Sequence, residues 1–213
     1  TSASKIDRTA MEHLQPTSFS DLLALLPGGK TSDPKMNGAK NITLREVGTS
    51  SSNYNTSSLG TKFIIDGAPI STDANMQRLL TDPNTTFDAY NAVNAGVDMR
   101  NISTDNIESV EIIRGIPSVE YNDLTSGVVI IKQKQKATPV EARIKADQYG
   151  KLFSIGKGVE WKDQRTVLSA DAGFLDSYND PRDRLNNFKR INASVRLNKK
   201  WLLGNEHRLN WTA

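Results

Sequence analysis

The chain has 213 residues, with 27 basic and 24 acidic side chains, a net charge of +3 and no cysteine. The missing cysteine excludes disulfide frameworks, thiolate metal sites and cysteine nucleophiles, and a net charge this small argues against nucleic acid as a partner. The longest apolar run, residues 22–26, is far shorter than the roughly 20 residues of a membrane-spanning helix. This length suits one or two domains. The first residues also lack a signal-peptide pattern, so we expect a cytoplasmic chain or one already trimmed.

Two short amphipathic helices are predicted at the start of the chain. The first is expected to begin at a Ser4 cap and to end before Pro16, because apolar residues recur at every fourth position between them. The second follows a capping box formed by Ser18 and Asp21, and Pro27 ends it.

The next part of the chain is rich in turn-forming residues. Residues 30–60 predict a mobile loop with one strand at 42–47, and residues 71–100 predict loops with one helical turn near 74–80. Between these loops, residues 62–65 read as a strand that ends in the tight turn Asp66-Gly67. Pro69 restricts the segment after this turn to a sheet edge or coil.

Two further strands are predicted at 109–114 and 127–132, joined through a turn at residues 115–117 and a short link. The lysines that follow, at 132, 134 and 136, predict a solvated linker.

Beyond residue 136, apolar and polar residues alternate with a period of two. Five such segments follow one another, at about 140–147, 152–161, 168–174, 191–198 and 208–213. Segments of about ten residues match strands that cross a bilayer at a tilt, and charged residues at alternate positions suit a water-filled lumen. Connections that are short, then long, then moderate suggest turns on one side and loops on the other.

No catalytic, cofactor-binding or metal-binding residues are expected. Residues 28–31 resemble the end of a phosphate-binding loop but lack its first glycine and its preceding strand. The two histidines, His13 and His207, are expected to be ordinary surface or lumen residues. Oxygen ligands between residues 176 and 183 could hold calcium but lack the spacing of a known calcium loop, so a hydrophilic loop is the simpler interpretation.

Several motifs appear together in a fixed order. Residues 106–115 read NIESVEIIRG and are followed by Pro117, Tyr121 and the strand SGVVII at 126–131. Upstream lie FIIDGAPI at 63–70 and the helix motif at 18–27. Together these motifs resemble the plug domain of TonB-dependent outer-membrane receptors. The run from residue 100 to 108 is similar to receptors of Bacteroidota, including the starch-utilisation type.

The resemblance implies an α+β plug domain at residues 1–136, followed at 137–213 by the first antiparallel strands of a transmembrane β-barrel that this length cannot close. The chain would then be a fragment of a receptor, and no enzyme, in the outer membrane of a Gram-negative bacterium with its plug accessible from the periplasm. Such a receptor binds a scarce nutrient (a siderophore, vitamin, glycan or peptide) and imports it when the plug is displaced. The implied partners are a TonB-type periplasmic energy-coupling protein that acts on a segment upstream of Thr1, the nutrient, outer-membrane lipid and a surface lipoprotein lid.

The resemblance and the strand pattern select a set of candidate site residues in the plug motifs and at the contacts between plug and barrel: Asp66, Gly67, Glu108, Glu111, Arg114, Gly115, Tyr121, Gly127, Arg143 and Lys145. Polar residues 141–147 would face the lumen and meet Glu111 and Arg114, while the apolar residues between them, such as Ile144, would face lipid. Two alternatives stay open: a soluble β-rich ligand-binding module with a small α/β domain, and a hydrolase that uses carboxylates.

Overall fold

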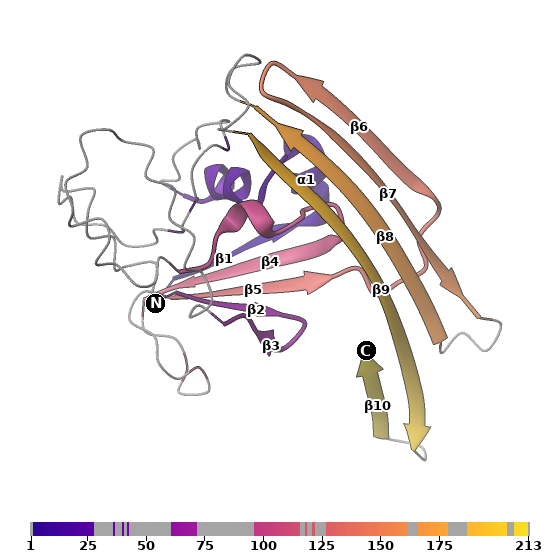
Figure 1. The fold of residues 1–213 in the computed structure, drawn as a ribbon. Coiled ribbons are helices and arrows are strands. Elements are labelled where there is room, and N and C mark those ends of the chain that lie inside the picture. Colours follow the sequence, from indigo (N-terminus) through magenta and orange to yellow (C-terminus); the bar gives the residue numbers. More distant parts are fainter. Residues whose placement is uncertain are drawn as a thin grey trace. The chain divides into compact units, whose positions relative to one another are not determined.

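The computed structural model describes residues 2–27, 36, 40, 42, 61–71, 96–115, 118, 121, 127–161, 166–178, 187–203 and 207–212. The chain divides into two compact units, Thr1–Gln133 and Lys134–Ala213, and each contains its own five-stranded sheet (Figure 1). Residues 43–47 of the strand predicted at 42–47, and all of the helical turn predicted at 74–80, fall outside the described residues. Within the described segments, no helix is both long enough and apolar enough to cross a membrane.

The sheet of the first unit is mixed. Its strands lie in the order β1 (Ser2–Asp7), β4 (Ile107–Arg114), β5 (Gly127–Gln133), β2 (Thr61–Ile65) and β3 (Ala68–Pro69). The central pair β5 and β2 is parallel, and every other neighbouring pair is antiparallel. The short strand that contains Pro69 lies at the edge, as predicted, because proline cannot donate to a further strand.

The first predicted helix is wrong over its first half. Residues 2–7 form strand β1, which pairs with β4, and helix α1 covers only Arg8–Leu14. Asp7, and not Ser4, caps this helix: its carboxylate accepts a hydrogen bond from the Ala10 amide at 2.9 Å. The repeat of apolar residues at 6, 10 and 14 was misleading because an edge strand also needs one inward residue, and Ile6 is the buried residue of β1.

The second helix is confirmed with a tighter geometry. Element η1 is a 3₁₀ helix over Phe19–Leu25. Its capping box is complete, since the Ser18 hydroxyl accepts from the Ser20 amide at 3.3 Å and the Asp21 carboxylate accepts from the Ser18 amide at 3.1 Å. The helix is short because the capping box fixes where it begins and Pro27 follows soon after its end.

One face of the first sheet forms the core of this unit. Helix α1, η1 and the segment 96–102, which contains the 3₁₀ turn η4 (Met99–Asn101), supply the side chains that pack on it. Phe63 of β2 lies edge-on to Phe19 of η1, with 5.7 Å between the ring centroids and 66° between the ring planes. This buried aromatic pair joins the sheet to the second helix.

A β-bulge in β4 changes which residues face the core. The register shifts between Ile107 and Ser109, so Glu108 is an extra residue relative to β5. As a result both Ile107 and Val110 are buried in the core, although they are an odd number of positions apart, while Glu108 is exposed. The bulge therefore places a charged residue in solvent without breaking the apolar face.

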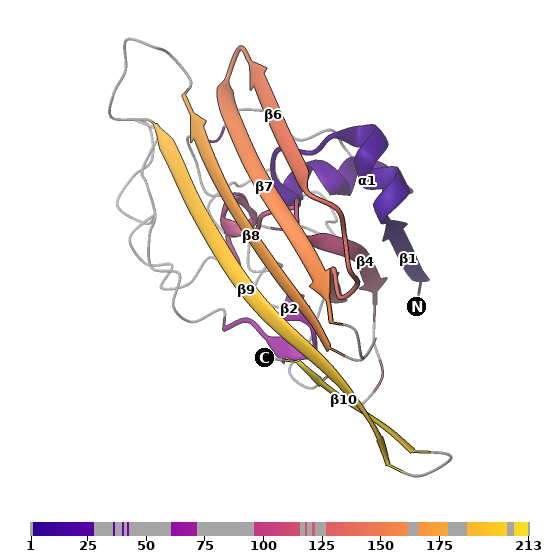
Figure 2. The same ribbon diagram turned by 90° about the vertical axis from the view of Figure 1, so that its right-hand side faces the viewer.

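The second unit is an antiparallel sheet whose strands follow one another in chain order (Figure 2). The strands are β6 (Glu141–Asp147), β7 (Gly150–Glu160), β8 (Thr166–Ser177), β9 (Phe188–Leu203) and β10 (His207–Thr212). All five predicted strands are confirmed. Figure 2 shows β7, β8 and β9 as long, curved ribbons that run side by side.

The expected alternation of connection lengths is only partly correct. The longest connection, residues 178–187, joins β8 to β9 at one end of the sheet, and the connections at 161–165 and 204–206 lie at the other end. The turn between β6 and β7, residues 148–149, shares the end of the longest connection and yet is the shortest. The third connection is also shorter than predicted because β9 continues to Leu203.

Candidate functional site

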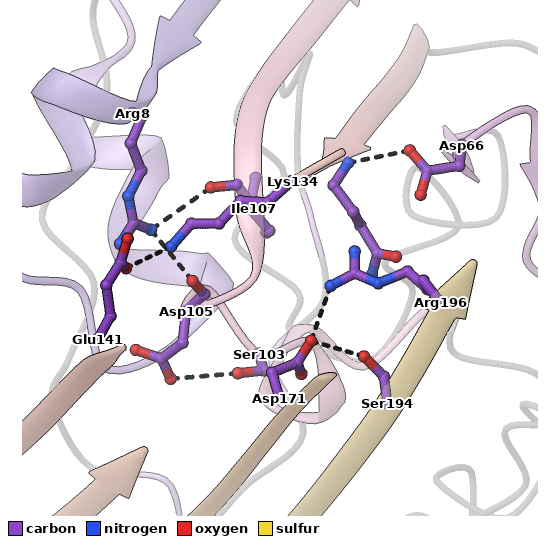
Figure 3. A network of polar contacts seen from close by, with 11 residues as sticks. Arg8, Asp66, Ser103, Asp105, Ile107, Lys134, Glu141, Asp171, Ser194 and Arg196 are labelled. Atoms are coloured by element: carbon purple, nitrogen blue, oxygen red, sulfur yellow. Dashed lines mark hydrogen bonds and ion pairs between the residues drawn. The ribbon is translucent and has the colours of Figure 1, made fainter. Parts of the chain in front are cut away.

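The Asp66-Gly67 turn is a type I′ hairpin that is fastened to the central strand. Both residues have positive φ, 48° and 89°, which is the geometry that an Asp-Gly pair adopts most easily. The Asp66 amide donates to the Ile131 carbonyl at 3.0 Å, and its carboxylate accepts from the Gln133 amide at 2.9 Å (Figure 3). These two candidate residues therefore hold the β2–β3 hairpin against the end of β5.

A second group of candidate residues lies at the opposite end of β5. Arg114 ends β4, pairs in register with Gly127, and donates from both terminal nitrogens to the Pro27 carbonyl at 3.3 Å. Gly115 follows with φ of 100°, a conformation that a residue with a Cβ adopts only with strain. Gly127 lies about 20 Å along β5 from Gln133. The plug-motif residues thus mark two ends of one strand and form no single cluster.

The remaining candidates of the first unit have local roles. Glu111 is half-buried on the face of β4 that points away from the core, in register with Lys5 and Ile130. Glu108 is the exposed bulge residue. The Tyr121 amide donates to the Ser118 carbonyl at 3.0 Å.

A buried ion pair that the sequence does not indicate lies in a segment predicted to form loops. The side chains of Asp98 and Arg100 are 6% and 8% exposed, and Arg100 donates to Asp98 Oδ2 from Nε at 2.9 Å and from Nη2 at 2.7 Å. Arg100 Nη1 also donates to the Met36 carbonyl at 2.9 Å, and Asp98 Oδ1 accepts from the Lys40 amide at 3.2 Å. The pair therefore joins two segments that are about 60 residues apart in the chain.

The second sheet has an apolar face that is exposed and a polar face that is less exposed. Apolar side chains are 79% exposed at Ile144, 80% at Ile191 and 70% at Val195, whereas Arg190 and Arg196 on the other face are only 6% and 8% exposed. Water-facing sheets of soluble proteins show the reverse distribution. Neighbouring strands keep their apolar residues in register, so the exposed apolar positions form one continuous surface.

Charges on the polar face are paired. Asp171 Oδ1 accepts from Arg196 Nη2 and from the Ser194 hydroxyl, both at 2.7 Å (Figure 3). The two other candidate residues, Arg143 and Lys145, lie half-buried on the same face of β6. Lys145 is 3.8 Å from Asp147. Arg143 and Lys145 are thus neighbours on the polar face of the second sheet.

The three lysines predicted to form a solvated linker differ in their surroundings, since Lys132 lies within β5 and Lys134 and Lys136 follow it. The Lys134 side chain is only 13% exposed and forms an ion pair of 2.5 Å with Glu141 of β6. Its neighbours Lys132 and Lys136 are exposed, as predicted. The interpretation failed at Lys134 because the alternation alone does not show which lysine faces an acid.

No group of three or more acidic or histidine side chains that could hold a metal ion occurs in the described part of the chain. Most of the loop that was considered for calcium, residues 179–183, lies outside that part. Asp176, at its beginning, is 3.9 Å from Lys189.

The chain thus combines a mixed sheet that has helices on one face with an antiparallel sheet that has an exposed apolar face. Residues 1–129, more than half of the chain, match the family model for the TonB-dependent Receptor Plug Domain. The chain belongs to this family, which is one of receptors and not of enzymes. The expected α+β plug domain followed by antiparallel strands is therefore confirmed.

Solved structures agree with this fold. The siderophore receptor PirA from Acinetobacter baumannii matches 99% of this chain with a TM-score of 0.58 and 18% identity, over 31% of its own length. The ferric-catecholate import receptor Fiu from E. coli K12 matches 98% with a TM-score of 0.56 and 16% identity, over 26% of its length. The ferric yersiniabactin uptake receptor FyuA from Yersinia pestis matches 93% with a TM-score of 0.55 and 15% identity, over 28% of its length. This chain spans under a third of these relatives, and no curated protein matches its sequence.

Proposed function

We propose that the chain is the plug and the first barrel strands of an outer-membrane receptor that imports a scarce nutrient in a Gram-negative bacterium. The observation that carries this proposal is the exposed apolar face of β6–β9, with its charged residues on the opposite face. Hydrocarbon accepts such a face, whereas water does not. The family membership of residues 1–129 supports the same function.

Import requires that the plug be held and yet be movable. In this proposal Glu111 of the plug pairs with Arg143 and Lys145 of the barrel wall, and Arg114 of the plug pairs with the wall acids Glu141 and Asp147. Water can replace such contacts when they separate, so they resist displacement less than buried apolar packing would. A TonB-type periplasmic protein would supply the force through a segment upstream of Thr1.

The nutrient belongs to one of the four classes that the sequence suggested, and the siderophore class is the first to test. Three structural relatives are named as receptors for siderophores or iron complexes. A surface lipoprotein lid and a Bacteroidota origin stay predictions from the sequence.

Ile144→Arg in the complete receptor is expected to impair assembly in the outer membrane. Ile144 is 79% exposed on the apolar face, and an arginine near the bilayer midplane costs roughly 2–4 kcal/mol. The amount of heat-modifiable, folded receptor in outer-membrane fractions measures the effect.

Lys145→Ala is the matched control, because it changes the adjacent residue on the polar face. We expect it to leave assembly at the wild-type level. Equal assembly of wild type, Ile144→Arg and Lys145→Ala would contradict the lipid-facing assignment and favour a soluble binding module.

A further inference from the structure

In the described strands β6–β9, Lys157 is the one cation on the apolar face away from its two ends, where Lys151, Lys189 and Lys199 lie. We propose that Lys157 of β7 binds the phosphate of an anionic phospholipid headgroup in the periplasmic leaflet. This inference rests on the proposed function, since it requires that the apolar face meet lipid. It concerns a lipid-binding residue that the receptor function by itself does not need.

The position of Lys157 follows from the strand register. Lys157 is paired with Ala170 of β8, and Ala170 with Val195 of β9, so it shares a row with two apolar residues. On its own strand the neighbours on the same face are Ile155 and Val159, both exposed. Lys157 is itself exposed, and it stands alone as a charge among these apolar residues.

The two faces of the sheet differ in how their charges are neutralised. On the polar face, Arg196 has Asp171 at 2.7 Å. Among the described residues, the one acidic side chain on the apolar face is that of Asp176. Asp176 is in register with Lys151, and Lys151 is six positions from Lys157 along β7. Six residues of a strand span about 20 Å, which is far beyond the reach of a lysine side chain. Among the described residues, no acid on this face therefore lies within reach of Lys157. In the proposed function the molecules that cover this face are lipids, and we assign its negative partner to them.

The ends of the apolar face give the depth of Lys157. The Trp161 amide donates to the Thr166 carbonyl at 2.9 Å, so these two residues lie at the same end of the sheet. Thr166 is in register with Lys199 of β9. The Lys199 ammonium in turn lies 5.4 Å from the centre of the Trp201 ring. Trp161 and Trp201 thus mark one end of the face, and both are exposed. Tryptophan rings are typical of the headgroup level of a membrane.

The opposite end of the face is marked by Lys189 and Asp176. From Lys189 to Lys199 the strand advances about 34 Å, which at a barrel tilt of about 40° corresponds to about 26 Å of depth. This value agrees with the apolar band of roughly 25 Å in outer-membrane barrels.

Lys157 can reach the headgroup level from its place in this band. It is four residues from Trp161, about 13 Å along the strand and about 10 Å in depth at the same tilt. An extended lysine side chain is roughly 6 Å long, so its ammonium group can approach the level of the tryptophan rings while its methylene groups stay in hydrocarbon. Its cross-strand neighbour on the same face, Ala170, has only a methyl side chain, which leaves space for a lipid beside Lys157.

The long connection 178–187 indicates the leaflet. The connections at the tryptophan end, residues 161–165 and 204–206, are both short, whereas the opposite end holds the longest connection, residues 178–187, beside the two-residue turn 148–149. Short turns of outer-membrane barrels face the periplasm, where the leaflet consists of phospholipid. The ligand is therefore the phosphate of a phospholipid headgroup.

The test is retention of lipid by the complete receptor from vesicles of phosphatidylethanolamine and phosphatidylglycerol in equal parts, measured by native mass spectrometry. The variants are Lys157→Met and Lys157→Arg, and the control is Lys132→Met, which removes an exposed lysine from β5 of the plug. We expect Lys157→Met to reduce preferential retention of phosphatidylglycerol about fivefold, and Lys157→Arg and Lys132→Met to keep it.

Equal retention by wild type and Lys157→Met, with normal insertion of both, would overturn the role of Lys157 and leave the proposed function intact. Displacement of phosphatidylglycerol by millimolar inorganic phosphate would also overturn it, because the site would then bind free phosphate. Failure of the wild type to insert into any vesicle would contradict both proposals.

Discussion

Asp98→Ala is expected to destabilise the plug unit by about 3–5 kcal/mol. The substitution removes one partner of a buried ion pair and leaves the Arg100 guanidinium, 8% exposed, without its carboxylate. It also removes the acceptor of the Lys40 and Arg100 amides. Urea denaturation of residues 1–136, which we expect to fold alone because they contain their own core, measures the change in the free energy of unfolding.

An exposed ion pair of the same unit provides the control for Asp98→Ala. Glu12 accepts from Arg8 at 2.9 Å on the surface of α1, and its side chain is 57% exposed. Glu12→Ala should change the free energy of unfolding by less than about 0.5 kcal/mol. Similar losses for the two variants would contradict the buried environment of Asp98.

Phe63→Ala should be as damaging, again by about 3–5 kcal/mol, for a different reason. Phe63 is fully buried between the sheet and η1, and its removal leaves a cavity beside Phe19 as well as the lost apolar contact. Urea denaturation of the same polypeptide gives the size of the loss.

Leu25→Ala, at an exposed position of η1, is the control for Phe63→Ala. We expect it to cost far less because little apolar surface returns to water. If Phe63→Ala were tolerated as well as Leu25→Ala, the aromatic contact between β2 and η1 would not hold the core together.

The strands with a simple pattern could be predicted from the sequence. In the segments after residue 136, apolar and polar residues alternate strictly. Because successive residues of a strand face opposite sides, this alternation correctly predicts that Ile144 and Arg143 lie on opposite faces of the sheet. The Asp66-Gly67 turn was also predictable, since few dipeptides accept two positive φ angles.

Features that depend on distant parts of the chain could not be predicted. The Asp98–Arg100 pair is buried because segments near residues 36 and 40 cover it, and nothing local in the sequence indicates that contact. The bulge at Glu108 depends on the register with β5. Strand β1 forms because β4 offers a free edge, and that tertiary contact overrides the helical pattern of residues 4–7.

The central claim is that the apolar face of β6–β9 meets lipid, and cysteine labelling tests it most directly. The chain contains no cysteine of its own, so Ala142→Cys and Ile144→Cys would each place a single thiol on this face of β6. In native outer membranes of the complete receptor, we predict that both thiols react with a lipid-soluble maleimide and not with a membrane-impermeant one, and that both reagents react after denaturation. Ready reaction of both thiols with the impermeant reagent in native membranes would contradict the account.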